Sequence, residues 1–184
     1  GPILFKGIKI GLMICEDMWH PDVAESLQES GAELLIVING SPFDQNKEDE
    51  RLSVAVARVV ETNLPLIYVN QIGGQDELVF DGGSFALDSS SKLKLQSSAW
   101  KEEINHIKII NNNNNLLDLS HSVVNKISVG LESKYSAMVL GLRDYVNKNK
   151  FKGVILGLSG GIDSALAVAI AVDALGKDKV RGIR

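Results

Sequence analysis

Two kinds of hydrophobic pattern alternate in the first half of the chain. Three short apolar runs bounded by turn residues have the length of buried strands: Ile8–Cys15, Leu34–Ile38 and Leu66–Val69. Between these runs, apolar residues recur at helical spacing in one segment from Pro21 to Gly31 and in another that ends at Thr62, before Pro65. Glycine pairs then punctuate shorter strands, in a pattern that suits hairpins better than crossovers. We therefore expect this part to be mixed α/β.

The second half of the chain has a different pattern. A low-complexity run, Asn111–Asn115, offers no apolar surface to bury and precedes a predicted helix over about 129–149. A strand at Val154–Leu158, a helix at Ser164–Leu175 and a strand from Val180 then predict one βαβ unit with a glycine-rich first turn. The predicted division is a first domain at 1–110, a linker at 111–128 and a second domain at 129–184.

Composition narrows the class of protein. The 184 residues are 45% hydrophobic with a net charge of −4, which is typical of a globular protein. No apolar run has transmembrane length, and no secretory signal is visible, so the cytoplasm is the expected location. The absence of basic blocks argues against nucleic acid as a partner and favours a small-molecule substrate. Because the chain begins at Gly1-Pro2 and stops at Arg184 inside an apparent strand, we expect it to be a fragment.

A glycine-rich turn between strand and helix is the first candidate for chemistry. Its residues are Gly157, Leu158, Ser159, Gly160, Gly161, Ile162, Asp163 and Ser164. Such a turn points backbone N–H groups and a helix N-terminus at one space, where anions bind. Asp163 would repel a phosphate unless a cation such as Mg²⁺ bridged them, so we predict that it is a metal ligand. The alternative is a tight turn with Asp163 complementing the helix dipole.

The single cysteine is the second candidate. Cys15 ends a predicted buried strand, and Glu16 and Asp17 follow it directly. A thiol at a strand-to-helix elbow faces a pocket and is placed as a nucleophile. The alternative is an inert core cysteine, although a dry core would not readily accept the two carboxylates beside it. The charged run Glu48–Arg51 is interpreted as a solvated helix start.

These motifs resemble two known families. The glycine-rich turn lacks the Walker lysine and resembles the PP-loop of ATP pyrophosphatases, which cleave ATP between its α and β phosphates. Ile14–Pro21 looks like the nucleophile motif of the nitrilase (carbon–nitrogen hydrolase) family, and Asn39–Phe43 and Tyr68–Gly82 strengthen that match. Together the two halves resemble the family of bacterial glutamine-dependent NAD synthetases. The fold implied is the C-terminal part of a nitrilase-like αββα sandwich, followed by the start of a Rossmann-like PP-loop α/β domain.

The resemblance implies roles for particular residues. It makes Cys15 the nucleophile that releases ammonia from glutamine, and it places Ser41 and Lys47 against the bound glutamine, with Lys47 pairing its α-carboxylate. ATP and Mg²⁺ would bind at the PP-loop, and the acceptor would be deamido-NAD, nicotinate adenine dinucleotide. A homo-oligomer is also expected. The family's catalytic Glu and Lys lie upstream of the cysteine, and Lys6 and Lys9 are too close to Cys15 to serve.

Two other readings stay open at this point. One is another PP-loop amidotransferase such as a GMP synthetase, although the Gly-x-Cys-x-Gly elbow of that class is absent here. The other is a non-catalytic fragment that binds nucleotide but turns nothing over, because the family's Glu and Lys are not supplied by residues 1–184.

Overall fold

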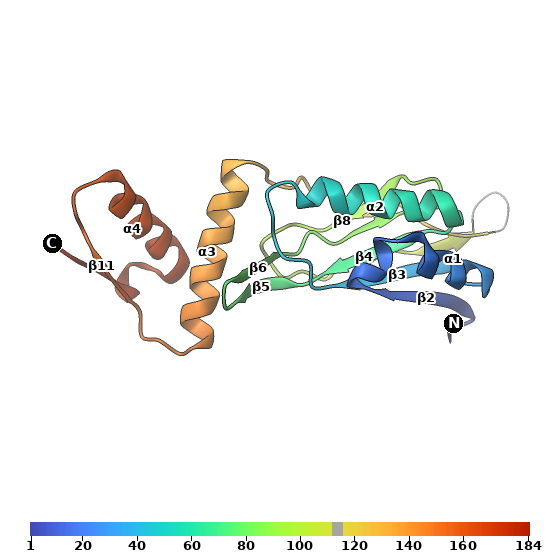
Figure 1. The fold of residues 1–184 in the computed structure, drawn as a ribbon, viewed down its shortest axis with the longest axis horizontal. Helices are drawn as coiled ribbons and strands as arrows, with labels where there is room; N and C mark the ends of the chain where they lie inside the picture. The colour runs from blue at the N-terminus through green and yellow to red at the C-terminus, as the bar shows by residue number, and fades with distance from the viewer. Residues whose placement is uncertain (112–115) are drawn as a thin grey trace.

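In the computed structural model, which describes residues 1–111 and 116–184, the first half of the chain is one sheet with two helices on one face (Figure 1). The sheet has six strands in the order β1-β2-β3-β4-β7-β8. Their bounds are β1 (Ile3–Phe5), β2 (Ile8–Ile14), β3 (Leu34–Asn39), β4 (Leu66–Asn70), β7 (Phe85–Leu87) and β8 (Leu93–Gln96). The helices are α1 (Pro21–Glu29) and α2 (Lys47–Thr62). The mixed α/β class expected from the sequence is confirmed.

Strands β2, β3 and β4 run parallel because each pair is joined through a helix, which is the crossover that parallel pairing requires. Pro21 occupies the first turn of α1, and Asn63 ends α2 in the left-handed conformation at φ 56°. The parallel arrangement brings the carboxyl ends of β2, β3 and β4 to one edge of the sheet. Cys15, Gly40 and Gln71 follow those three ends directly.

The core lies between the sheet and the two helices. Met13, Val37 and Tyr68 point to this face from successive strands and meet Ala55 and Val59 of α2, all almost completely buried. Burial of apolar surface on this scale is the dominant stabilising contribution to a fold. On the opposite face Leu12, Ile14, Ile38 and Val69 are 39–68% exposed, so this side of the sheet carries an uncovered apolar surface.

Part of the opposite face is covered by the segment predicted to be a linker. β10 (Leu117–Leu119) pairs antiparallel with β9 (Ile109–Asn111), and Leu119 is 1% exposed in a cluster with Leu34 and Leu95. Leu117 and Leu119 of the predicted linker therefore pack on the sheet, because their alternation supplies an apolar face. The Asn run predicted as the boundary lies, over 112–115, outside the described residues.

A hairpin and a long helix lead to the second half. β5 (Ile72–Gln75) and β6 (Leu78–Asp81) form an antiparallel hairpin, and α3 (Leu131–Lys148) packs across it (Figure 1). The βαβ unit predicted from the sequence follows as β11 (Val154–Gly157), α4 (Ile162–Leu175) and β12 (Val180–Ile183), with the two strands parallel and a short 3₁₀ turn, η2 (Lys177–Lys179), before β12.

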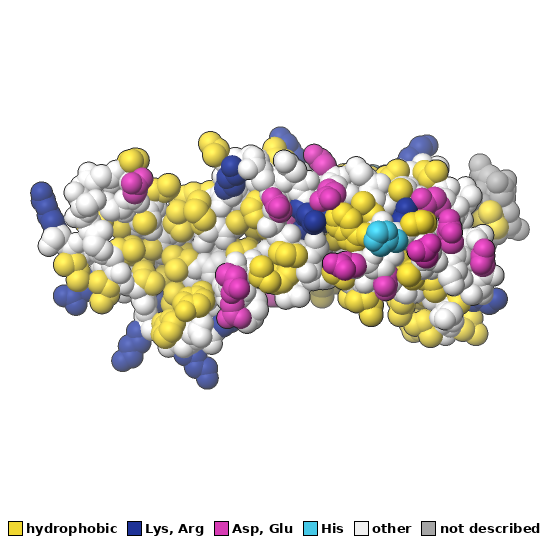
Figure 2. Space-filling model, in the orientation of Figure 1, with side chains coloured by type: hydrophobic (Ala, Val, Ile, Leu, Met, Phe, Trp, Pro, Cys, Tyr) yellow, Lys and Arg dark blue, Asp and Glu magenta, His cyan; other side chains and the backbone are white. Residues whose placement is uncertain are grey.

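The surface of this βαβ unit is apolar. Hydrophobic side chains gather over α4 and β11 (Figure 2), where Ile155 and Ile162 are 67% and 80% exposed. Among the helices of the described residues, none combines the length and the apolar character needed to cross a lipid bilayer.

Candidate active site

The three residues predicted for the cysteine site lie in one cavity. Cys15, Ser41 and Lys47 line a cavity of about 420 Å³, together with Glu16, Trp19, His20, Gly40 and Pro42. They come from the carboxyl ends of β2 and β3 and from the start of α2. Ligand sites at the carboxyl ends of parallel strands follow from that topology. The sequence patterns that pointed to these positions therefore describe a single concave site.

Cys15 is held at a sharp elbow. It follows the last residue of β2, begins the 3₁₀ turn η1 (Cys15–Met18), and has a φ of 51°, in the left-handed region. A residue with a Cβ adopts that conformation at a cost of about 1–3 kcal/mol, and such strain gathers at functional sites. The Asp17 carboxylate accepts the Ile14 N–H at 2.8 Å and fixes the turn. The half-buried thiol is presented to the cavity instead of packing in the core.

The cation of the site is Lys47. Its Nζ lies 4.5 Å from the centroid of the Trp19 ring and 3.2 Å from a carboxylate oxygen of Glu50. The ring face attracts the ammonium group and keeps it at the cavity wall. The Trp19 side chain therefore forms part of the cavity wall.

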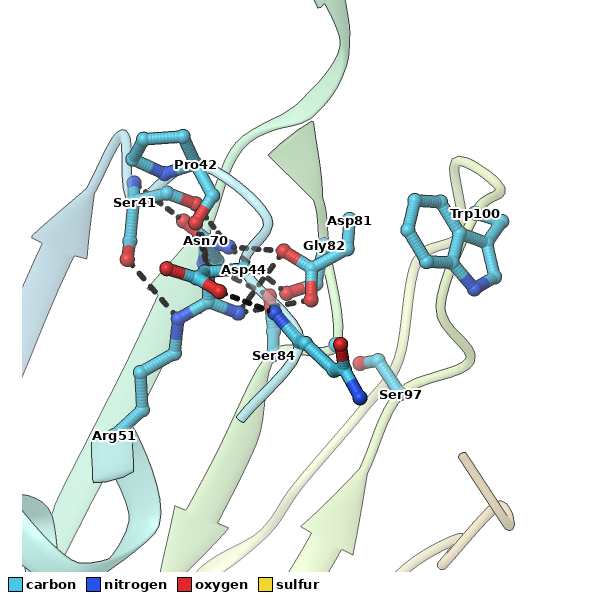
Figure 3. Close-up of polar contacts among 12 residues, drawn as sticks. Ser41, Pro42, Asp44, Arg51, Asn70, Asp81, Gly82, Ser84, Ser97 and Trp100 are labelled. Atoms are coloured by element: carbon cyan, nitrogen blue, oxygen red, sulfur yellow. Dashed lines mark hydrogen bonds and ion pairs between the residues drawn. The ribbon is translucent and has the colours of Figure 1, made fainter. Parts of the chain in front are cut away.

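Behind the Ser41–Pro42 wall of the cavity lies a buried polar network that the sequence did not reveal. Arg51 of α2 is 3% exposed and makes an ion pair with Asp81, with nitrogen–oxygen distances of 2.9 Å (Figure 3). The solvated helix start expected over Glu48–Arg51 is therefore wrong for its last residue. The signal that could have found it is spacing, because Arg51 lies in line with Ala55 and Arg58 on the buried face of α2.

The pKa values of two side chains near this buried network are raised. Burial raises the pKa of Tyr68, against the opposing effects of the Arg51 charge and a hydrogen bond with Ser41. Burial also raises the pKa of Glu48, and the neighbouring Asp49 and Asp81 charges raise it further, while Arg51 lowers it. Perturbed acidities next to a concave site are typical of functional regions.

The second predicted site is the turn between β11 and α4. Gly160 has a φ of 83°, which favours glycine, and a Cβ added at Gly160 or Gly157 would have no heavy atom within 4 Å. The Ser159 and Ser164 hydroxyl oxygens lie 3.2 Å apart, and Ser164 donates to the Gly161 carbonyl at 3.0 Å. This leaves an open, glycine-lined space at the start of a 14-residue helix.

The turn has free donors and one carboxylate. Within the described part of the chain, no acceptor takes the backbone N–H groups of Ile162, Asp163 and Ser164, which are the first three of α4. Ser159 to Asp163 are exposed. A phosphate with a bridging cation fits this donor set, since Mg²⁺ is commonly held by one carboxylate together with substrate phosphates. No cluster of three or more potential metal-ligating side chains occurs in the described ranges.

The two sites are separate. The cavity lined by Cys15 includes no residue of the 157–164 turn. The cysteine cavity belongs to the six-stranded sheet, whereas the turn belongs to the βαβ unit on the far side of α3 (Figure 1).

Similar proteins have the same two parts in the same order. The glutamine-dependent NAD(+) synthetase of Rhodobacter capsulatus is 45% identical over 97% of this chain, and that of Acinetobacter baylyi is 37% identical over 97%. The chain spans about a third of the length of these relatives, 32% of each. The solved structure of the glutamine-dependent NAD+ synthetase from Acinetobacter baumannii, in complex with ADP, superposes with a TM-score of 0.88 at 36% identity, over 98% of this chain and 34% of that one.

Family models assign each part. The NAD synthase model matches residues 134–184, which include α4 and the turn before it. The carbon–nitrogen hydrolase model matches residues 2–111, which include the Cys15 elbow, the cavity and the buried network of Arg51 and Asp81. The nitrilase-like first part and the NAD synthetase-like second part expected from the sequence are thereby confirmed. Since the carbon–nitrogen hydrolase match covers more than half of the 184 residues, the chain belongs to the carbon–nitrogen hydrolase family.

Proposed function

We propose that the protein containing this chain is a glutamine-dependent NAD synthetase, a ligase that amidates deamido-NAD at the expense of ATP. The observation that carries the proposal is the pairing of two sites in one chain. A cysteine cavity lies in the carbon–nitrogen hydrolase match, and a glycine-lined anion site lies in the NAD synthase match. Relatives with both parts carry that name. The proposed location is the cytoplasm, and a homo-oligomer remains a prediction.

In the first site, the Cys15 thiolate attacks the side-chain amide carbon of glutamine. The carbon–nitrogen bond breaks, ammonia leaves after taking up a proton, and a thioester forms on the sulfur. Water then hydrolyses the thioester to glutamate and frees the thiol. Lys47 at the cavity wall pairs the α-carboxylate of glutamine, and Ser41 contacts the bound substrate. The family resemblance implies a general-base Glu and a catalytic Lys upstream of the cysteine.

In the second site, the 157–164 turn holds the phosphates of ATP. The N–H groups of Ile162, Asp163 and Ser164 bind phosphate oxygens, with hydroxyl donors from Ser159 and Ser164. Asp163 would hold a Mg²⁺ ion, which supplies charge neutralisation on the phosphates. The carboxylate of deamido-NAD attacks the α-phosphorus and pyrophosphate leaves. Ammonia then attacks the adenylated carbonyl and releases AMP, giving NAD.

The test is a product balance on the full-length protein. With glutamine, ATP, Mg²⁺ and deamido-NAD we expect NAD, AMP, pyrophosphate and glutamate in equal amounts. Formation of ADP and phosphate would contradict the assignment of the turn. Turnover with another carboxylate or carbonyl acceptor, but not with deamido-NAD, would favour a different PP-loop amidotransferase. Nucleotide binding without any turnover would favour a non-catalytic protein.

A further inference from the structure

All three guanidinium nitrogens of the buried Arg51, which lies behind the cysteine cavity, donate hydrogen bonds. Arg51 Nε donates to the Ser41 hydroxyl at 3.0 Å, and one terminal nitrogen donates to the carbonyls of Ser41 and Pro42 at 2.9 and 2.8 Å. The other terminal nitrogen faces both carboxylate oxygens of Asp81. Figure 3 shows these side chains converging from α2, β6 and the loop after β3.

Asn70 holds the same loop from the opposite side. Its Oδ1 accepts the Ser41 N–H at 2.9 Å, and its Nδ2 donates to the Ser41 carbonyl at 3.2 Å and to the Gly82 carbonyl at 3.1 Å. Ser41 therefore has its N–H, its carbonyl and its hydroxyl all engaged by Arg51 and Asn70. The loop from Gly40 to Asn46 has no helix or strand of its own, so these side chains determine its path.

The network also orients the Ser41 hydroxyl. Guanidinium nitrogens only donate, so the Ser41 oxygen must accept from Arg51 and its own hydrogen must point elsewhere. One of the remaining directions leads to the cavity that Ser41 lines. Arg51 does not line that cavity, so any influence it has on a bound molecule passes through Ser41 and Pro42.

We propose that Arg51 and its partner Asp81 are positioning residues, which hold the Ser41–Pro42 wall in the shape that binds glutamine. The proposal rests on the proposed function, because it assumes that the Cys15 cavity takes glutamine. Asp81 neutralises the guanidinium charge, and the rigid fork of arginine reaches Ser41, Pro42 and Asp81 together. A lysine ammonium is a point charge and cannot reproduce that fork.

A buried ion pair could serve stability alone, and the chain offers a matched control for that alternative. Asp88 is 5% exposed and pairs with Lys94 at 2.9 Å, just as Asp81 is 7% exposed and pairs with Arg51 at 2.9 Å. Asp88 accepts from Ser90 and Lys92 at the turn between β7 and β8 and makes no contact with Ser41. Asp88→Asn thus removes an equivalent buried charge without touching the cavity.

The experiment compares Arg51→Lys, Asp81→Asn and Asp88→Asn in the full-length protein, with glutamine or with ammonium salt as the nitrogen source. For Arg51→Lys and Asp81→Asn we expect the KM for glutamine to rise about tenfold or more, because small displacements of positioning groups have effects of that size. Synthesis from ammonium salt should stay within about twofold of the parent, because adenylation does not use this wall. Asp88→Asn should keep the parental KM for glutamine.

A second measurement separates binding from turnover. Alkylation of Cys15 can be followed by mass spectrometry of the peptide that contains it. In the two network variants, a glutamine analogue with an electrophilic side chain should label Cys15 about tenfold more slowly, while iodoacetamide labels it at the parental rate. If Arg51→Lys does not fold, the isosteric Asp81→Asn decides.

The outcomes are distinct. An unchanged KM for glutamine in the folded network variants, or an equal rise in Asp88→Asn, overturns the positioning role. A parent protein that makes NAD from ammonium salt but never from glutamine overturns the proposed function instead, whatever the network variants do.

Discussion

Glu48 lies half-buried in the first turn of α2, between Lys47 and the Arg51–Asp81 pair. Burial and the nearby Asp49 and Asp81 charges raise its pKa above the ordinary value of 4.5. A raised carboxyl pKa means that the charged form destabilises the folded state at every pH above that raised value. Below 4.5 both folded and unfolded chains are protonated at this position, and the effect vanishes.

We therefore predict that Glu48→Gln raises the thermal midpoint of unfolding at pH 7. The gain should shrink as the pH falls through the raised pKa and should disappear below about pH 4.5, where the side chain is neutral in either state. Thermal melts followed by circular dichroism across this pH range measure it. Glu50→Gln is the control, because Glu50 is exposed on the same helix and pairs with Lys47. Equal melts of Glu48→Gln and the parent at pH 7 would contradict the prediction.

Asp163 is the residue on which the metal assignment depends. Its carboxylate lies exposed in the first turn of α4, among N–H groups suited to phosphate. If it binds Mg²⁺, Asp163→Asn should reduce NAD synthesis about 100-fold or more, with glutamine and with ammonium salt alike, because the cation stabilises transferring phosphate charge by several kcal/mol.

The matched control is Asp173→Asn in the same helix, which removes a carboxylate charge away from the turn, where Asp173 accepts a hydrogen bond from the Tyr135 hydroxyl. Initial rates at several Mg²⁺ concentrations make the measurement. A variant at Asp163 that keeps normal Mg²⁺-dependent synthesis would show that this carboxylate merely complements the helix dipole.

At the residue scale, the sequence indicated positions whose signal was local. Cys15 follows β2 and the Ser159–Ser164 turn follows β11, so each candidate lies within a few residues of a strand end that an apolar run predicts. Arg51 and Asp81 were missed because they lie 30 residues apart and come together only in the folded chain. A polar residue inside an apolar helical stripe is the kind of conflict that marks such a pair.

At the scale of elements, the contact between α3 and the β5–β6 hairpin joins the two halves of the chain. Asp144 accepts the Gly74 N–H at 2.8 Å, and Lys148 donates to the Gly74 carbonyl at 2.6 Å. The backbones approach closely here: a Cβ added at Gly74 would lie 3.1 Å from the Gly141 Cα, and one added at Gly141 would lie 3.0 Å from Val79. Helix and hairpin can pack this tightly only with glycine on both sides.

Gly74→Ala should therefore destabilise the protein by about 1–3 kcal/mol, the usual cost of overpacking a close contact. Gly157→Ala is the control, because Gly157 also lies in a strand and its added Cβ would meet nothing within 4 Å. Denaturant unfolding of both variants gives the comparison. A Gly74→Ala protein as stable as the parent would mean that α3 can shift away from the hairpin without loss.

The elements themselves were predicted well where the pattern was long. The three parallel strands, their helices and the βαβ unit all correspond to apolar runs and helical spacing in the sequence. β10 was missed because it is only three residues long and adjoins the Asn run. A strand that short is specified by its partner β9 and by the burial of Leu119, and neither is visible in a sequence window.

At the scale of the whole molecule, one side of the sheet and the surface of α4 expose apolar side chains. Leu12, Ile14 and Ile38 lie on the sheet face away from α1 and α2, where the second sheet of the αββα sandwich implied by the family resemblance would pack. The relatives are about three times as long as this chain. Such surfaces in the full-length protein are therefore expected to be interior.

The two chemistries should be separable, because Cys15 and the 157–164 turn belong to different sites on opposite sides of α3. Cys15→Ala in the full-length protein removes the nucleophile with little change in volume. Cys15 lies at the cavity wall and is only half-buried, so the fold should survive. Synthesis from glutamine should fall to background, since no thioester can form. Synthesis from added ammonium salt should persist at a rate within about twofold of the parent, because the adenylation step uses neither the thiol nor glutamine.

The measurement is NAD formation with each nitrogen source, together with the thermal midpoint of the variant. Loss of both activities in a folded protein would give Cys15 a structural or coupling role. Retained synthesis from glutamine would show that the cavity cysteine is not the nucleophile.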